Sequence, residues 1–380
     1  MTDIRELLEG AVGEPPPSRL TAGPLYAAGR RRHRIRTVTT AALAALVAGV
    51  LAIGGGLLLP GGSDRSLPPG GDPTPSATPP AVPINWTGAA DAGHLYLARM
   101  ACPDLACPKT VVQLRGSSDG GRTWSDRGTP INWAGLAVVG PETLLASVST
   151  GQSGTRTLSA STDGGRTWRE VREGLTVDAV PSGSVAACWA GSGEPCALWA
   201  VDPVAGRMSP LRRQPDLAAD PNGLLPPRAD GRIWVRGTDP ATGRPAVAAS
   251  ADEGATWSVR VFGDAPATPA ELAISGSQVY AVAGDAVYRH GADNSWDRVS
   301  TVEPARTHAF VTADGTLVLC AVVPQPDGRD GCRFSATLEG LPATVYHIRR
   351  AADGWLYTHG YTDLRLFGSA DGWTWSAISD

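Results

Sequence analysis

The chain has 380 residues, of which 42% are hydrophobic and 18% are charged, and its formal net charge is only −4. A nucleic-acid partner needs a basic face on the folded part, and this charge balance gives no basis for one. Glycine (46) and proline (32) are both abundant, and frequent turn residues with ample apolar content are typical of an all-β protein with many short strands.

The first element in chain order is a candidate membrane anchor. No charged residue occurs from Thr37 to Ser63, and the apolar stretch at 37–59 is about as long as the ~20 residues that cross a bilayer core. Five arginines precede it directly, namely Arg30, Arg31, Arg32, Arg34 and Arg36. The positive-inside rule therefore predicts a cytoplasmic tail at 1–36, a single-pass transmembrane signal anchor at 37–59 and an extracytoplasmic remainder. A cleaved signal peptide is the alternative, and it fits less well because the leader is long and no clear A-x-A site follows.

Residues 60–83 form the next segment, PGGSDRSLPPGGDPTPSATPPAVP, which is rich in proline, glycine, serine and threonine. It lacks the apolar residues that a core requires. We therefore expect a disordered, semi-rigid spacer between the membrane and the folded domain.

Six cysteines follow in three local pairs, which are Cys102/Cys107, Cys188/Cys196 and Cys320/Cys332. Disulfides persist only in oxidising compartments, so pairing within each couple agrees with an extracytoplasmic domain. The alternatives are buried free thiols, or a metal site at the Cys102-x4-Cys107 string. A zinc site needs a second pair of ligands nearby in space, and the other pairs lie far along the chain.

From residue 84 to the end, the sequence repeats the motif S-x-D-x-G-x-T-W. It reads SSDGGRTW at 117–124, STDGGRTW at 161–168 and SADEGATW at 250–257, with a shortened SADGWTW at 369–375 and a degenerate GADNSW at 291–296. Asp119 and Asp163 are 44 residues apart, and the later copies follow at nearly one or two such steps. Two further degenerate units are therefore expected near 201–208 and 335–340.

Seven short apolar runs precede these turns, and we expect each to form the second strand of a four-stranded unit. The runs are 95–97, 144–146, 185–187, 233–235, 279–281, 317–319 and 355–357. A period of ~40–50 residues with four strands per unit is typical of a β-propeller. Residues 84–380 therefore predict an extracytoplasmic seven-bladed β-propeller with about 42 residues per blade.

The motif has a structural interpretation that needs no ligand. Glycine permits the positive φ of a tight turn, and the aspartate carboxylate accepts hydrogen bonds from turn N–H groups. Serine and threonine hydroxyls complete the network, and tryptophan buries its ring at the start of the outer strand. The residues expected in these turns are Ser117, Asp119, Gly121, Thr123, Trp124, Ser161, Asp163, Gly165, Thr167, Trp168, Ser250, Asp252, Gly254, Thr256, Trp257, Ser369, Asp371 and Trp375.

This motif resembles the BNR or Asp-box repeat of sialidases, sortilin-type receptors, xyloglucan-degrading hydrolases and photosystem assembly propellers. The resemblance covers about three-quarters of the chain and implies a sialidase-like propeller, here in a membrane-anchored bacterial envelope protein. It implies little about activity, because proteins with this repeat do different things. It places the Asp boxes between the third and fourth strands, at the rim. It also places the three cysteine pairs where the second strand turns into the third, in blades one, three and six.

No catalytic constellation is evident. The sialidase F/Y-R-I-P motif has no counterpart, since the nearest string is LARM at 97–100, and sialidases have six blades. A xyloglucanase-type hydrolase needs two facing carboxylates ~6.5–9.5 Å apart, and the candidates near first strands are Asp91, Asp178, Glu271 and Asp314. No two histidines have metal-binding spacing, so we expect neither a metal nor another cofactor. Trp355 and Trp373 are candidates for a carbohydrate platform, although strand aromatics more often pack in the core.

These observations predict a non-catalytic binding or scaffold propeller that recognises a protein or glycan at the cell envelope, through its funnel or a loop face. The alternative is a glycoside hydrolase of the sialidase-like or xyloglucanase-like type. The identity of the ligand, the oligomeric state and the closure of the ring are left open by the sequence.

Overall fold

The computed structural model describes residues 84–101, 111–128, 133–150, 155–190, 196–220, 224–263, 269–302, 307–324, 330–342, 344–345, 347–360 and 365–378. The expected tail (1–36), anchor (37–59) and spacer (60–83) lie outside these residues, as do Cys102 and Cys107. Within the part of the chain that the structure describes, no helix is long and apolar enough to cross a membrane.

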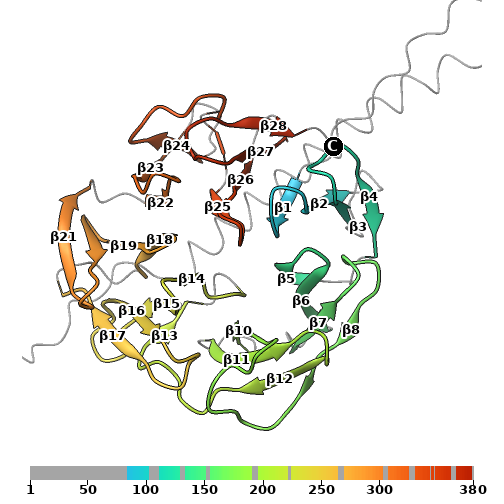
Figure 1. Cartoon of the computed structure of the whole chain (residues 1–380), viewed down its shortest axis with the longest axis horizontal. Coiled ribbons are helices and arrows are strands. Elements are labelled where there is room, and N and C mark those ends of the chain that lie inside the picture. The colour runs from blue at the N-terminus through green and yellow to red at the C-terminus, as the bar shows by residue number, and fades with distance from the viewer. Residues whose placement is uncertain are drawn as a thin grey trace, which may run out of the picture. The chain divides into compact units, whose positions relative to one another are not determined.

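The strands form seven sheets, arranged as blades around a ring (Figure 1). Blade one contains β1 (Ile84–Ala89), β2 (Leu95–Ala101), β3 (Val111–Ser117) and β4 (Ser125–Arg127). Blade two contains β5 (Trp133–Gly140), β6 (Thr143–Thr150), β7 (Thr155–Ser161) and β8 (Arg169–Glu170). Blade three contains β9 (Arg172–Glu173), β10 (Val185–Trp189), β11 (Ala197–Asp202) and β12 (Arg207–Pro210).

The remaining four blades follow in chain order. Blade four contains β13 (Ala218–Ala219), β14 (Arg228–Ala229), β15 (Arg232–Thr238), β16 (Pro245–Ser250) and β17 (Ser258–Val261). Blade five contains β18 (Glu271–Ser275), β19 (Gln278–Ala283), β20 (Ala286–His290) and β21 (Trp296–Thr301). Blade six contains β22 (Thr307–Val311), β23 (Leu317–Pro324) and β24 (Asp330–Phe334), and blade seven contains β25 (Arg349–Arg350), β26 (Leu356–His359), β27 (Leu366–Ser369) and β28 (Ser376–Ile378). The all-β, seven-bladed architecture expected from the repeats is confirmed.

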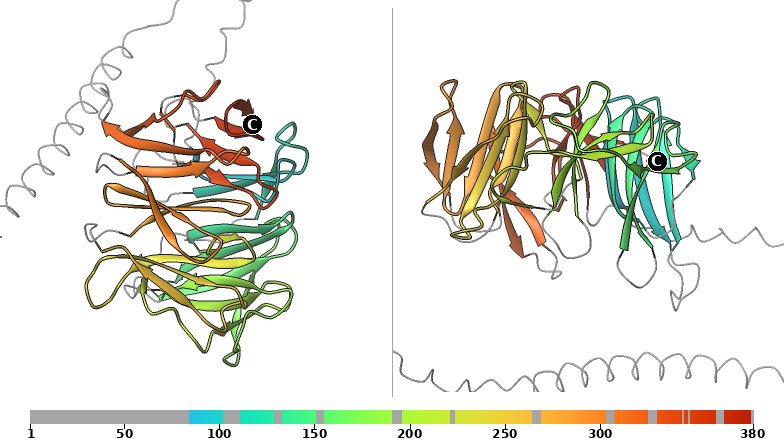
Figure 2. Two further views of the ribbon diagram at one scale, coloured as in Figure 1. Left: turned by 60° about the vertical axis from the view of Figure 1, so that its left-hand side comes forward. Right: turned by 90° about the horizontal axis from the view of Figure 1, so that it is seen from below.

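The order of strands explains where the apolar runs lie. In blades one, two, five and seven, the four strands follow chain order from the centre outward (Figure 1). Six of the seven apolar runs fall on the second strand of their sheet, as expected. Edge-on, the strands cross the thickness of the ring, so each sheet packs its two faces on its neighbours (Figure 2). A second strand, flanked within its sheet and covered on both faces, is therefore the most buried part of a blade.

Blade three departs from this pattern. Its apolar run forms β10, the innermost strand of the sheet, and the connection from blade two supplies β9 as an outer edge strand parallel to β12. The connection continues along the outer edge, where Val177 bridges Leu211. The inner edge of β10 is covered by the segment around Leu224, which lies between β13 and β14 in sequence. There the Cys188 N–H donates to the Leu224 carbonyl (2.9 Å).

Apolar side chains between adjacent sheets form the core. Between blades four and five, Trp234 and Phe262 are both 1% exposed and pack around the indole of Trp296. The two indoles meet edge to face at 5.9 Å, a favourable aromatic geometry. Such interfaces, repeated around the ring, hold each blade to the next.

The ring closes between blades seven and one without exchange of a strand among the described residues, since each of these sheets consists of its own four strands. Side-chain and backbone contacts join them instead. Thr87 Oγ1 lies 3.1 Å from His359 Nδ1, and the Ala92 N–H donates to Asp353 (3.1 Å). A Cβ on Gly121 would collide with Ile378 of β28, so glycine at that turn lets the last strand pack against blade one.

Two of the three expected cysteine pairs are disulfides in the described residues. Cys188–Cys196 joins β10 to the start of β11, and Cys320–Cys332 joins β23 to β24, with Cα–Cα distances of 5.3 and 5.2 Å. Cys320–Cys332 joins the second strand of blade six to the third, as expected, whereas Cys188–Cys196 joins the two innermost strands of blade three, because the apolar run of that blade forms its first strand. The third pair lies outside the described residues.

Candidate functional site

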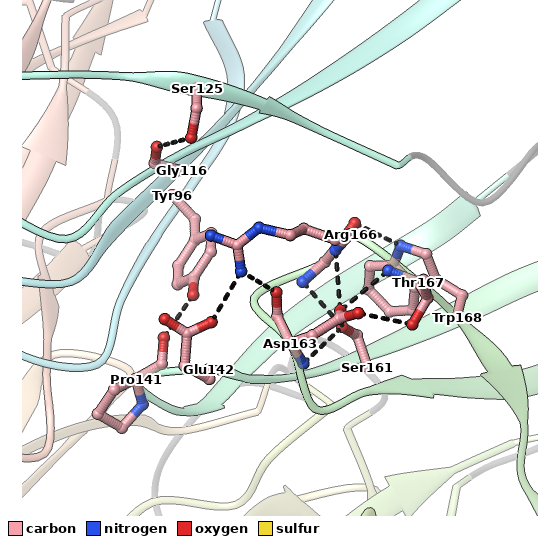
Figure 3. Close-up of polar contacts among 11 residues, drawn as sticks. Tyr96, Gly116, Ser125, Pro141, Glu142, Ser161, Asp163, Arg166, Thr167 and Trp168 are labelled. Atoms are coloured by element: carbon pink, nitrogen blue, oxygen red, sulfur yellow. Dashed lines mark hydrogen bonds and ion pairs between the residues drawn. The ribbon is translucent and has the colours of Figure 1, made fainter.

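The complete Asp boxes share one hydrogen-bond network, drawn for blade two in Figure 3. Ser161 Oγ donates to Asp163 (2.8 Å) and accepts the Gly165 N–H (2.8 Å). The Asp163 carboxylate also accepts the backbone N–H (2.9 Å) and hydroxyl (2.6 Å) of Thr167. Gly165 has φ of 85°, which glycine adopts without strain. The Trp168 indole N–H donates to the Gly165 carbonyl (3.1 Å), so the last residue of the motif is hydrogen-bonded to its turn.

These bonds keep the box carboxylates ionised. The hydroxyl hydrogen bond from the threonine, followed by its backbone N–H, lowers the pKa of Asp119, Asp163 and Asp252 to about 2 in each case. In blade seven the motif lacks one residue, yet Asp371 still accepts the Thr374 N–H (2.8 Å). The indoles of the three complete boxes are half-buried, and Trp375 alone is buried, at 4% exposure. The carboxylates thus stabilise the turns in which they lie.

The expected degenerate units are also turns. Asp202, between β11 and β12, accepts the N–H groups of Val204 (2.9 Å) and Ala205 (2.7 Å), and Gly206 has φ of 66°. After β24, Gly340 has φ of 77°. The backbone turn therefore persists where most of the motif has been lost.

Of the four carboxylates considered for hydrolysis, three serve turns or the surface. Asp91 accepts the N–H of Gly93 (2.7 Å) in its own turn, and Asp178 is exposed and pairs with Arg212 (2.5 Å). Asp314 accepts a hydroxyl and an N–H in the turn before β23. Only Glu271 lines the centre of the ring.

The two tryptophans considered for carbohydrate binding pack within blade seven. The Trp355 ring lies against Gly368, where a Cβ would collide with it, and stacks on Tyr357 at 6.0 Å. The Trp373 indole N–H donates to Asp314 (3.3 Å), which ties blade seven to blade six. Both rings are half-buried in these contacts.

A central funnel forms a cavity with a volume of about 950 Å³ in the described part of the chain. Its walls come from the innermost strands β1, β5, β18, β22 and β25, from β10 and from residues 224–225. None of its described lining residues belongs to an Asp box. The recognisable repeat residues and the main cavity are therefore separate parts of the molecule.

The funnel lining contains more positively than negatively charged side chains. Its described lining contains four arginines, Arg156, Arg236, Arg349 and Arg350, whereas Glu271 is the single acid. Arg236 is neutralised, because its Nε lies 3.1 Å from Asp220 and its NH1 contacts Glu271. Arg350 donates to backbone carbonyls of Val311 and Gly354.

Whereas the guanidinium of Arg350 is occupied by backbone carbonyls, Arg156 and Arg349 supply charge that is both uncompensated by a carboxylate and exposed. Both side chains are exposed in the funnel. Among the described residues, no carboxylate lies within ion-pair distance of either one. Arg349 donates to the Thr87 carbonyl (3.2 Å) and is also hydrogen-bonded to the Tyr357 side chain. The funnel is therefore a concave, cationic surface.

Glu271, His308 and His347 meet in the wall of this funnel, with one potential ligand atom of each within 4.8 Å of the others. Burial acts to raise the pKa of Glu271, but His308 and the charge of Arg236 outweigh it, so the pKa lies below its usual range. Desolvation by the funnel walls, then the charge of His308, lower the pKa of His347 to about 4, although its ring has an exposed face.

No two histidines have metal-binding spacing along the sequence, because the three residues of this cluster come from three different blades. Glu271 and His308 are 37 residues apart, and His308 and His347 are 39 apart. These separations are close to one repeat period, so the three residues occupy similar positions in successive blades. A search for polar residues recurring at the repeat period would have found them.

No protein-family model matches the chain, and no curated protein is significantly similar to it. Solved structures do resemble it, at identities that show the fold alone. A structure from an analysis of two prolyl endopeptidases is 12% identical over 79% of this chain, with a TM-score of 0.50, and this chain spans 49% of its length. A YCF48 protein bound to D1 peptide is 15% identical, with coverages of 81% and 87% and a TM-score of 0.32. The GH74 xyloglucanase from Xanthomonas campestris is 14% identical, with coverages of 77% and 72% and a TM-score of 0.25.

Proposed function

We propose that the chain is a non-catalytic binding propeller of the cell envelope, whose funnel receives a carboxylate-bearing segment of another protein. The observation that carries this proposal is the imbalance of charge in the cavity. Arg156 and Arg349 face the funnel without carboxylate partners among the described residues, and the single lining acid, Glu271, is ion-paired with Arg236, which it shares with Asp220. Its envelope location rests on the expected anchor at 37–59 and on the two disulfides.

A cationic concavity favours an anionic ligand for two reasons. Walls of low dielectric constant focus the field of the arginines and raise the local concentration of the ligand. The planar guanidinium also matches a carboxylate bidentately, which adds geometric selectivity to the charge. Both reasons apply to Arg156 and Arg349, because each side chain is exposed and lines the cavity.

The apolar lining favours an acidic peptide over an acidic glycan. Trp86, Trp189, Leu224 and Leu225 are half-buried residues of the funnel wall. Their apolar surface would contact the side chains that flank an acidic residue in a peptide. Ligand sites of this kind combine a mostly apolar wall with a few placed polar groups. An acidic glycan is the other outcome that the experiment below distinguishes.

The hydrolase alternative receives little support from the funnel. Glycoside hydrolysis by the common mechanisms requires two carboxylates across a cleft. Among the described lining residues only Glu271 carries one, and Arg236 holds it as an ion pair. Catalytic turnover of aryl-glycosides, lost in Glu271→Gln, would overturn the non-catalytic proposal.

Fluorescence anisotropy of the purified full-length chain tests the proposal. The probes are fluorescein-labelled octaglutamate, octaglutamine and an acidic uronate octasaccharide, with EDTA present throughout. We expect octaglutamate to bind, more weakly at high salt, and octaglutamine not to bind. Arg156→Gln/Arg349→Gln should weaken binding at least about tenfold, because hydrogen bonds to charged groups contribute ~1.5–3 kcal/mol each.

The matched control is Arg212→Gln/Arg298→Gln, which removes the same two charges from arginines that pair with acids outside the funnel, Asp178 and Asp285. Its affinity for octaglutamate should equal that of the wild type. Equal losses in the two double variants would show non-specific charge attraction and would contradict a funnel site. Binding of the uronate alone would replace the protein partner with an acidic glycan.

A further inference from the structure

We propose that Glu271, His308 and His347 bind one divalent transition-metal ion, and that Zn²⁺ fits their donor set best. One potential ligand atom from each residue lies within 4.8 Å of the other two. This inference goes beyond the proposed binding of an acidic ligand and does not depend on it.

The propeller brings these three residues together by its symmetry. Glu271 begins β18 in blade five, His308 lies on β22 in blade six, and His347 lies two residues before β25 in blade seven. These are the innermost strands of three successive blades. Since adjacent inner strands converge on the axis (Figure 1), the three side chains reach one point in the funnel wall.

The contacts of Glu271 leave one of its oxygens for a ligand. Arg236 NH1 contacts Oε2, whereas Oε1 faces His308 Nδ1 at 3.9 Å, which is longer than a hydrogen bond. Arg236 is itself fixed by Asp220 (3.1 Å). It therefore orients the carboxylate, as outer-shell partners of metal ligands do.

The environment of the two imidazoles gives a second reason to expect a metal ion. His308 Nδ1 is buried and makes no hydrogen bond within the part of the chain that the structure describes, and an unsatisfied buried polar atom costs ~1–3 kcal/mol. The ring centroids of His308 and His347 lie 3.6 Å apart, so two positive charges would repel strongly. A neutral imidazole is the form that ligates a metal, and a bound ion would satisfy His308 Nδ1, which the Arg236–Glu271 ion pair does not.

The donor chemistry selects the metal class. Imidazole nitrogens with one carboxylate suit zinc and its first-row neighbours, whereas magnesium and calcium prefer oxygen ligands. Zinc lies ~2.0–2.2 Å from each ligand atom, so tetrahedral ligands are roughly 3.5 Å apart. The 3.9 Å separation of Oε1 and Nδ1 nearly meets this requirement, and rotation of the exposed His347 ring would complete it. Three protein ligands leave a fourth position open to the funnel.

Metal titration of the untagged full-length chain, stripped with EDTA and dialysed, tests the proposal. Zn²⁺ is titrated by calorimetry, and Co²⁺ by its visible absorption, which reports the geometry and ligand type of the bound ion. We expect one equivalent of each, with a four-coordinate nitrogen and oxygen spectrum for Co²⁺. His308→Ala and His347→Ala should each weaken binding by more than about tenfold, since losing only an outer-shell partner costs ~10–100-fold.

His94→Ala is the matched control, because His94 is half-buried and bonded to Asp91 in the turn before β2. It should bind both metals as the wild type does. Thermal unfolding without metal checks each variant, and the exposed position of His347 makes its substitution the less disruptive one. Absence of saturable binding in the wild type, or binding that survives both histidine substitutions, would overturn the proposal. The octaglutamate titration is done in EDTA and does not depend on metal binding. Failure of the metal titration therefore does not imply failure of the octaglutamate titration, or the reverse.

Discussion

Thr87 on β1 and His359 on β26 join the two ends of the ring, with Oγ1 3.1 Å from Nδ1 across 272 residues of sequence. Both side chains are buried, at 3% and 6% exposure. No strand is exchanged between blades one and seven in the described part, so such side-chain contacts and the apolar packing around Leu95 and Ile378 carry the closure.

Thr87→Val should therefore destabilise the domain. It keeps the shape of the side chain but removes a buried hydrogen bond, which costs about 1–3 kcal/mol when the partner is left unsatisfied. Urea unfolding measures this difference, with the exposed Thr301→Val on β21 as the control. If Thr87→Val unfolds at the wild-type urea concentration, the contact does not contribute to closing the ring.

The closure should also weaken in mild acid. Burial, then the charges of Arg349 and His347, lower the pKa of His359 to about 3, whereas a histidine in the unfolded chain titrates near ~6.5. Below about pH 6.5, His359 is protonated in the unfolded state but stays neutral in the folded state. The contribution of His359 to stability is therefore complete above ~6.5 and falls as the pH drops toward 3. Between pH 6.5 and 5 we expect His359 to contribute a loss on the order of 2 kcal/mol in the unfolding free energy, to which His347, with a pKa of about 4, adds. His359→Gln should flatten this slope, and an unchanged slope would assign the acid sensitivity elsewhere.

The Asp-box turns should matter for stability and not for binding. Ser161→Ala leaves the buried Gly165 N–H without its acceptor and should cost about 1–3 kcal/mol. Ser125→Ala is the control drawn in the same view, since Ser125 is exposed and makes only a 3.4 Å bond to the Gly116 carbonyl (Figure 3). Both variants should bind octaglutamate as the wild type does. A selective loss of binding in Ser161→Ala would contradict a purely structural role for the box.

The disulfides should stabilise their hairpins. Cys188–Cys196 and Cys320–Cys332 close loops of 8 and 12 residues, for which the loop-entropy model gives roughly 2.5–3 kcal/mol each. Thermal unfolding with and without reductant measures the effect, and peptide mapping under non-reducing conditions identifies the pairs. Six free thiols in protein isolated from its native envelope would contradict the extracytoplasmic assignment.

The sequence predicted the repeated parts of this fold because repetition leaves a signal. Asp119 and Asp163 recur at one period, and apolar runs such as 95–97 and 144–146 recur with them, so the number of blades followed. Where the repeat breaks, prediction failed. The edge strand β9 and the place of Leu224 beside Cys188 depend on how an irregular connection packs, and no local pattern encodes that.

The funnel was predictable only in part, for a related reason. Glu271 was one of four candidate carboxylates, yet its sequence neighbours do not show that it meets His308 and His347. That meeting is set by the rotation between blades. Arg156 lies on a third strand rather than an inner one and reaches the cavity only through the tertiary fold. Residues such as Asp163 are easier to recognise because their partners lie within four positions in sequence.

Photocrosslinking locates the ligand site most directly. Octaglutamate with a terminal benzophenone is irradiated with the full-length chain, and the adducts are mapped by mass spectrometry. We expect adducts on segments that line the funnel, at 135–139, 271–274 and 347–352, and their loss in Arg156→Gln/Arg349→Gln. Adducts confined to the Asp-box turns at 117–124, 161–168 and 250–257, or adducts unchanged in the double variant, would contradict the funnel as the binding site.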